Sequence, residues 1–237
     1  MIKTFKVSKL IADAGICSRR KAELLIREGR VKLNNKILTS IPERATVKDL
    51  IKVDNKKINL KKKTRLWKYY KPKGKLTTNY DPLGRKTIFE ELPKNLPRVV
   101  TVGRLDFNSE GLLLLTNSGS LARYLELPKN SLIREYKVKI KGKIDIEKLK
   151  NLEKGITIKG IKYESIKVNI IEKNKNNAWI KMRLMEGKNR EIRKIISFFG
   201  WTINKLKRIS YGPIQLKEIK KNEVKEINIS KYFKKIP

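Results

Sequence analysis

The chain has 237 residues, of which 39% are hydrophobic, enough for a sizeable core and for two domains. Lys and Arg number 59 against 23 Asp and Glu, and the resulting net charge of +36 indicates a polyanionic partner such as nucleic acid. A single cysteine excludes an internal disulfide framework, and the lack of histidine excludes Ser-His-Asp and Cys-His catalysis. No stretch approaches the roughly 20 apolar residues of a membrane span, and the first residues do not resemble a signal peptide. We therefore expect a cytoplasmic protein with no membrane partner.

Residues 7–29 show the pattern of two short helices separated at Gly15. Ser18 is a suitable N-cap for the second helix, and Gly29 is expected to end it. Short strands joined by Asn-rich turns are expected after Gly29. The residues of the second helix expected to face inward are Leu24, Leu25 and Ile26.

This N-terminal segment resembles the small RNA-binding domain of the S-four type, which occurs in a ribosomal small-subunit protein. The matching positions are Leu10, Gly15, Ser18, Arg19, Arg20, Ala22, Ile26, Gly29, Val31 and Asn34. The resemblance implies RNA phosphate contacts from the second helix and its preceding turn, namely from Ser18, Arg19, Arg20, Lys21 and Arg27. A solvated basic helix face is the alternative, but Arg19 and Arg20 stand at a helix N-terminus, which attracts phosphate. We predict an RNA-binding domain at residues 1–60 and a lysine-rich linker at residues 61–64.

Asp106 lies in a polar turn between two apolar segments, residues 99–102 and the leucine run 112–115. A carboxylate on a loop held between buried strands is a common arrangement in active sites. An aspartate that only caps its own turn would give the same local pattern. From the pattern alone, both interpretations of Asp106 are open.

The other elements of the second half follow from apolar periodicity. A strand begins at residue 65 and is interrupted at Pro72, and a turn containing Arg85 follows. Residues 134–140 alternate as a strand with Tyr136 on its inner face, where a core aromatic is the simplest interpretation. Further segments are a helix at 120–127, a helix at 145–153, strands within 156–171 and 178–185, a helix from 186 to 199, and a strand with a turn at 206–216. Arg190 and Arg193 are three apart and are expected to share one helix face.

Six motifs in this half resemble those of pseudouridine synthases that modify ribosomal RNA. Residues 103–119 match the pattern G-R-L-D, four residues, then G-L-L-L-L-T-N-x-G. The others are K-P-x-G at 71–74, D-P-x-G-R at 81–85, E-Y-x-V at 135–138, E-G-K-x-x-x-I-R at 186–193 and L-x-R-x-x-x-G-x-I-x-L at 206–216. The resemblance covers about residues 8–220, and its departures are Ser118 and Ser120, where acids are common, and no histidine before Pro128.

The resemblance implies an α+β fold in which residues 65–237 form a catalytic domain on a mixed, mostly antiparallel sheet flanked by helices. It implies conversion of a specific uridine in ribosomal RNA to pseudouridine, without a metal or cofactor. The implied roles are catalysis for Asp106, an ion pair from Arg193 that keeps Asp106 ionised, and stacking on the target base for Tyr136. Arg104 would fill the space that the extruded base leaves, and Leu206 would pack under the site. The remaining implied RNA contacts are Arg85, Arg190 and Arg208.

Ribosomal RNA, free or in an assembling subunit, is the expected partner of a monomeric enzyme. The alternative is an RNA-binding ribosome-assembly factor with no catalytic activity, for which the basic N-terminal segment alone would be sufficient. The set of Asp106, Tyr136 and Arg193 favours the enzyme, because a protein that only binds RNA has no need of it. An RNA methyltransferase would need a Gly-rich cofactor loop after its first strand, and the sequence has none.

Overall fold

The computed structural model of the chain describes residues 3–60 and 63–233. The chain divides into two compact units: an N-terminal unit of residues 1–65, 94–100 and 116–119, and a C-terminal unit formed by the rest. The predicted linker includes Lys61 and Lys62, which lie outside the described residues. Across the described ranges, no helix is both long and apolar enough to cross a bilayer.

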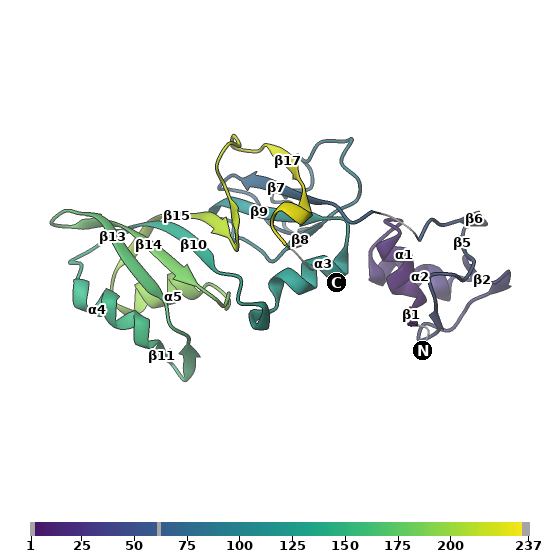
Figure 1. Cartoon of the computed structure of the whole chain (residues 1–237), viewed down its shortest axis with the longest axis horizontal. Coiled ribbons are helices and arrows are strands. Elements are labelled where there is room, and N and C mark those ends of the chain that lie inside the picture. The colour runs from purple at the N-terminus through teal and green to yellow at the C-terminus, as the bar shows by residue number, and fades with distance from the viewer. Residues whose placement is uncertain (1–2, 61–62, 234–237) are drawn as a thin grey trace. The chain divides into compact units, whose positions relative to one another are not determined.

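The N-terminal unit contains two helices and a set of short strands (Figure 1). They are β1 (Phe5–Lys6), α1 (Val7–Asp13), α2 (Arg19–Arg27), β2 (Val31–Leu33), β3 (Lys36–Ile37), β4 (Arg44–Ala45), β5 (Ile51–Val53) and β6 (Lys56–Lys57). Strands β3, β2, β5 and β6 form one sheet in that order, and β1 pairs with β4. One apolar cluster, which includes Val7, Ile11, Ala22, Ile26 and Ile51, packs the helices against these strands.

The start of α2 is as predicted, since the Ser18 hydroxyl accepts a hydrogen bond from Lys21 N at 3.2 Å. The prediction for Leu24 is wrong, because its side chain is 43% exposed. Ala22, Leu25 and Ile26 form the buried stripe instead. At 100° per residue, positions 22, 25 and 26 lie on one side of the helix and position 24 turns away from it.

The C-terminal unit is built on one mixed sheet, in which the described residues contribute nine strands. Its main path runs β13-β14-β10-β15-β9-β7-β17, with β8 beside β9 and β16 beside β15. The bounds are β7 (Leu66–Lys71), β8 (Val100–Val102), β9 (Glu110–Thr116), β10 (Arg134–Lys141), β13 (Lys167–Lys173), β14 (Asn177–Leu184), β15 (Thr202–Tyr211), β16 (Ile214–Gln215) and β17 (Val224–Ile227). The pairings are mostly antiparallel, and β9 joins β15 in parallel, so the fold is α+β with a mixed, mostly antiparallel sheet.

Helices cover one face of the β13-β14-β10 part of this sheet (Figure 1). The remaining elements are α3 (Gly119–Glu126), η1 (Pro128–Asn130), α4 (Ile146–Asn151), η2 (Leu152–Lys154), β11 (Ile156–Ile158), β12 (Ile161–Tyr163), α5 (Glu191–Phe198) and η3 (Ile229–Lys231). Leu149 of α4 and Ile195 of α5 pack against Val138 and Ile180 of the sheet. Residues 156–163 form a separate two-stranded hairpin, and α5 begins at Glu191 rather than at the predicted residue 186.

The two halves of the sheet meet where β9 lies beside β15. Gly111 pairs with Arg208, and a Cβ atom at Gly111 would stand 2.2 Å from the carbonyl oxygen of Arg208. The backbone at Gly111 has a φ of +107°, which side-chain-bearing residues rarely adopt. The glycine that opens the leucine run therefore permits the contact between β9 and β15.

Candidate active site

Asp106 lies in the turn between β8 and β9, where backbone contacts hold it on both sides. Ser109 N donates to Asp106 O at 3.0 Å, and Thr77 Oγ1 donates to Leu105 O at 2.8 Å. All seven residues of β9 are buried, so the turn leaves from a rigid strand. This local order fixes the position of the carboxylate before any substrate binds.

Lys71, at the end of β7, supports the same turn from below. Its side chain is fully buried, and its Nζ donates to Pro72 O at 3.0 Å, Asp106 O at 3.1 Å and Ser109 O at 2.9 Å. An ammonium group has three donors, so all of them are satisfied. Burial lowers the pKa of Lys71 to about 8, although the Asp106 carboxylate opposes this shift. Lys71 therefore holds the turn that contains Asp106 rather than binding solvent.

Two arginines face the Asp106 carboxylate. Its Oδ2 atom is 3.4 Å from Arg193 Nε and 3.6 Å from Arg190 Nη1. Arg193 also donates from Nη2 to Asn108 O at 2.9 Å and to Ser109 Oγ at 3.1 Å. Burial lowers the pKa of Arg193, and Asp106 opposes that shift, but a guanidinium stays charged in proteins. Both guanidinium groups thus form ion pairs with the Asp106 carboxylate.

Arg190 reaches Asp106 by a route that differs from the predicted one. It is not on a face of α5, because it precedes the helix as the N-cap residue with a left-handed φ of +52°. Arg193 lies within the first turn of the helix. The prediction that both arginines share a helix face is therefore wrong, although both contact the carboxylate.

One cleft of about 660 Å³ contains the carboxylate and most of the predicted site residues. The predicted residues that line it are Arg104, Asp106, Tyr136, Arg190, Arg193, Leu206 and Arg208. Tyr136 comes from β10 and is half-buried against the core, while Leu206 of β15 is 5% exposed. Arg104 is exposed. A cleft of this size is within the range of small-molecule sites, which run from roughly 300 to 1,000 Å³.

Two buried arginines support the floor of the cleft. Arg134 Nη2 donates to Tyr211 Oη at 2.8 Å and to Glu126 O at 3.1 Å, and so joins β10 to the end of α3. Arg208 is 3% exposed, and its Nε donates to Leu112 O at 2.7 Å. Among the described residues, its Nη2 has no hydrogen-bond partner. The buried Nη2 atom of Arg208 is thus an unsatisfied donor group next to the cleft.

Glu191 adds a buried acid to the edge of the cleft. It is 4% exposed, and its Oε2 accepts a hydrogen bond from Lys188 N at 3.0 Å. Burial, together with the neighbouring Glu186 carboxylate, raises the pKa of Glu191 to about 7. This carboxyl group therefore changes its charge near neutral pH.

The other predicted RNA contacts lie outside the cleft. Ser18, Arg19, Arg20, Lys21 and Arg27 belong to α2 and its cap in the N-terminal unit. Arg85 is exposed and forms an ion pair with Asp81 of its own turn at 2.8 Å. Over the part of the chain that the structure describes, no group of three or more His, Cys, Asp or Glu side chains is arranged to hold a metal ion.

Residues 65–198 match the RNA pseudouridylate synthase family, and residues 6–51 match the S4 domain. The chain belongs to the RNA pseudouridylate synthase family. Members of this family are RNA pseudouridine synthases, which are isomerases, and the chain is therefore an enzyme of that class.

Relatives of this pseudouridine synthase are similar along almost its whole length. An uncharacterised RNA pseudouridine synthase of Rickettsia felis is 50% identical, over 94% of this chain and 96% of that protein. The ribosomal large subunit pseudouridine synthase B of Bacillus subtilis is 36% identical, over 94% and 91% respectively. A crystal structure of a pseudouridylate synthase superposes with a TM-score of 0.68 at 22% identity, covering 96% of this chain and 98% of that one, and supports the fold.

Sequence reasoning gave no role to two residues that hold this synthase site together, Lys71 and Arg134. Lys71 ends a six-residue strand that is buried throughout. A lysine at the end of an apolar strand indicates a buried charge that needs hydrogen-bond partners, and this was the feature of the sequence that pointed to Lys71. Arg134 begins an alternating strand and gave no comparable signal, because its partners Glu126 and Tyr211 are distant in sequence.

Proposed function

We propose that the chain isomerises a specific uridine of ribosomal RNA to pseudouridine, and that Asp106 is the catalytic residue. The observation that carries the proposal is the ion pair of Asp106 with Arg193, at 3.4 Å, inside the cleft. A ribosomal RNA substrate is favoured by the name of the Bacillus subtilis relative and by the match to the S4 domain.

The reaction breaks the bond between N1 of the base and C1′ of the ribose, and forms a bond between C5 and the same C1′. The C5 proton is lost and N1 gains a proton, so the product is an isomer of the substrate. Asp106 either attacks C1′ or removes a ribose proton, and both roles require an ionised carboxylate near the sugar. Arg193 forms an ion pair with that carboxylate.

The target base has to leave the RNA stack to reach Asp106. Tyr136 lines the cleft and is half-buried, so its ring would stack on the extruded base. Arg104 is exposed and also lines the cleft, which suits it to fill the space left in the RNA. Arg190 and Arg208 would bind phosphate or base oxygens from the cleft wall, and Leu206 supports the base from below.

The N-terminal unit would supply a sequence-independent grip on the RNA. Its α2 begins with Arg19, Arg20 and Lys21, directly after the Ser18 cap, so these cations lie at the N-terminus of the helix. Residues 1–60 are proposed as this RNA-binding domain, residues 61–64 as the linker and residues 65–237 as the catalytic domain. Arg85 is a further proposed contact. We also propose that the enzyme acts as a monomer.

Asp106→Asn tests the catalytic role, because it is nearly isosteric and removes the charge. We expect the variant to bind ribosomal RNA with the parent's affinity and to release no tritium from RNA labelled at uridine C5. Asp13→Asn is the matched control, since Asp13 forms a surface ion pair with Lys9 and is outside the cleft. Appreciable turnover by Asp106→Asn would refute the assignment. A parent chain that binds RNA but makes no pseudouridine would favour an assembly factor.

A further inference from the structure

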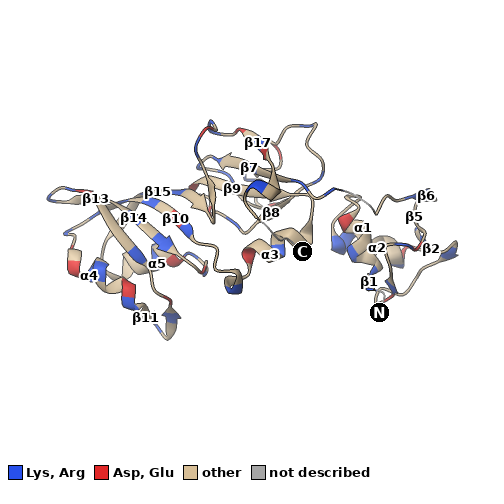
Figure 2. Cartoon of the chain, viewed as in Figure 1, with Lys and Arg blue, Asp and Glu red and all other residues tan. Residues whose placement is uncertain are grey.

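The face of β14, β10 and β15 that points away from the core is strongly basic. Along these strands Val138, Ile180 and Leu206 point into the core at alternating positions. The side chains between them that point outward, called here the basic sheet face, are Lys137, Lys139, Trp179, Lys181, Arg183, Lys205 and Lys207. Figure 2 shows Lys and Arg recurring along these three strands.

Lysines stand directly opposite one another across this face. Lys137 pairs in register with Lys181 on β14 and with Lys207 on β15. Like charges in directly opposite positions repel, so this row disfavours the folded chain on its own. Glu135 relieves one end, through ion pairs with Arg183 and, at 3.7 Å, with Lys181. Glu110 pairs with Lys205 at 3.4 Å, and this leaves Lys137, Lys139 and Lys207 as the cations of the face for which no ion pair is found among the described residues. A polyanion laid across the strands would neutralise the row.

Trp179 places an aromatic ring among these cations. It pairs in register with Lys139, and the ring centre is 4.9 Å from Lys137 Nζ and 5.8 Å from Lys139 Nζ. Trp179 is half-buried, whereas Trp67 and Trp201 are 3% and 6% exposed. A ring flanked by cations on an open sheet can stack on a base while the cations bind the adjoining phosphates.

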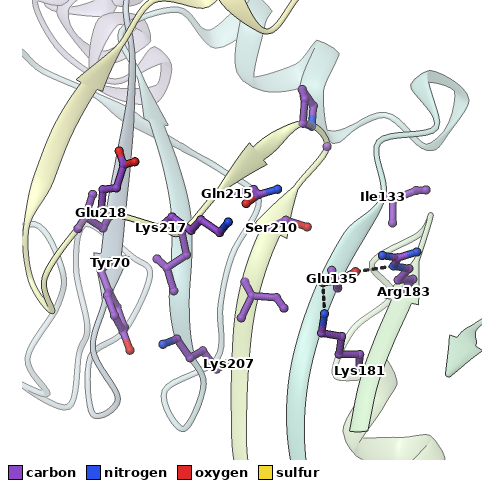
Figure 3. A pocket seen from close by; sticks show the side chains of 15 residues that line it. Tyr70, Ile133, Glu135, Lys181, Arg183, Lys207, Ser210, Gln215, Lys217 and Glu218 are labelled. Atoms are coloured by element: carbon purple, nitrogen blue, oxygen red, sulfur yellow. Dashed lines mark hydrogen bonds and ion pairs between the residues drawn. The ribbon is translucent and has the colours of Figure 1, made fainter. Parts of the chain in front are cut away.

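The basic sheet face continues into a groove of about 780 Å³ (Figure 3). Lys181 and Arg183 lie on one side of it, Tyr70 and Lys217 lie on the other, and Lys207 lies between them. The groove shares no residue with the cleft that contains Asp106. Along β15 the residues alternate between the two, with Lys207 in the groove and Leu206 and Arg208 in the cleft, so they open on opposite faces of the sheet.

We propose that the basic sheet face is a second RNA-binding surface, which holds the phosphate backbone and one base of a segment remote from the target uridine. The proposal deepens the proposed function, since it takes RNA as the substrate. The surface adds affinity without contacting the reacting nucleotide, because phosphate contacts position a protein and carry no sequence information. A large RNA could thereby contact both faces of the same sheet.

A charge-neutralised variant of the full chain tests the surface, with Lys137, Lys139 and Lys207 each changed to Gln. Its matched control changes three exposed lysines of α4, η2 and β12 to Gln, namely Lys148, Lys154 and Lys162. Affinity for a full-length large-subunit ribosomal RNA transcript is measured at several salt concentrations. We expect the slope of log affinity against log salt to become shallower by about two to three in the first variant, and by less in the control. Equal changes in both variants would overturn the proposal.

Folding and catalysis are controlled separately. Removing mutually opposed charges should leave the thermal unfolding midpoint of the first variant unchanged or raise it. A measured midpoint at or above that of the parent shows that a loss of RNA affinity does not come from unfolding. Pseudouridine formation by the parent chain is measured on the same transcript. An inactive parent would refute the proposed function, while the salt slopes would still decide whether the basic sheet face binds RNA.

Tryptophan fluorescence gives an independent measurement. Because Trp67 and Trp201 are buried, quenching of the emission by poly(U) is expected to come from Trp179. Trp179→Phe should therefore remove most of the quenching. Quenching that persists in Trp179→Phe would mean that RNA does not stack at this position and would overturn that part of the proposal.

Discussion

Changing Lys71 to methionine tests how the turn that contains Asp106 is held. Methionine has nearly the same length as lysine and suits the buried site, but it removes all three hydrogen bonds to Pro72 O, Asp106 O and Ser109 O. Two of these carbonyls belong to the turn that carries the proposed catalytic carboxylate. The variant should therefore lose both stability and turnover.

The size of the stability loss follows from the contacts. Asp106 O keeps its hydrogen bond from Ser109 N, so two buried carbonyls, Pro72 O and Ser109 O, lose their donor. Each costs about 1–3 kcal/mol, and the two together cost about 2–6 kcal/mol. Burial lowers the pKa of Lys71 from 10.5 to about 8. Replacing this buried charge by an uncharged side chain therefore stabilises the folded state by about 3 kcal/mol, because each unit of the pKa shift corresponds to about 1.4 kcal/mol. The middle of the resulting range is a net destabilisation of about 1 kcal/mol near neutral pH.

The same pKa gives a pH dependence with a defined sign. Between pH 8 and 10.5 the unfolded chain keeps the Lys71 proton and the folded chain releases it. The unfolded state then binds more protons, so the free energy of unfolding of the parent rises with pH from this group. Lys71→Met lacks this contribution, and its stability deficit should grow by up to about 3 kcal/mol over that window.

Urea denaturation followed by tryptophan fluorescence is a suitable assay, because Trp67, Trp179 and Trp201 all belong to the C-terminal unit. Lys68→Met is the matched control: Lys68 is also a buried lysine of β7, but it donates to one carbonyl, Lys217 O, at 2.5 Å. We expect the control to lose about 1–3 kcal/mol. If the stability deficit of Lys71→Met did not grow between pH 8 and 10.5 at equal m-values, the account of the buried Lys71 charge would be refuted.

Two further predictions concern the cleft. Tyr136→Phe should bind RNA as the parent does and release less tritium, because the ring can still stack without its hydroxyl; turnover equal to the parent would assign Tyr136 to packing alone. Glu191 has its pKa raised to about 7 from 4.5, so the folded chain binds more protons between these pH values and its stability falls as pH rises through them. In urea titrations of the parent, the Glu191 carboxyl should lower the free energy of unfolding by up to about 3 kcal/mol between pH 4.5 and 7, and Glu191→Gln should remove this fall. The same pH profile in parent and variant would contradict the burial of this acid.

The sequence by itself determined the elements whose signals are local. The Ser18 cap, the alternation of β10 and the buried leucines of β9 follow from capping chemistry and from apolar periodicity. The motif spacing also placed Asp106 in a turn between two strands. Each of these features depends on residues within a few positions of one another, so the sequence carries the whole signal.

Only the tertiary structure decided which side chains meet. Lys71 and the Asp106 turn are 35 positions apart, and their contact depends on β7 lying in the same sheet as β9. Arg190 reaches the carboxylate from a left-handed N-cap, a conformation that helical spacing does not predict. The basic sheet face likewise depends on register, since only pairing places Lys137 between Lys181 and Lys207. Register is set by the packing of the buried face, which involves residues from the whole unit and leaves no local pattern.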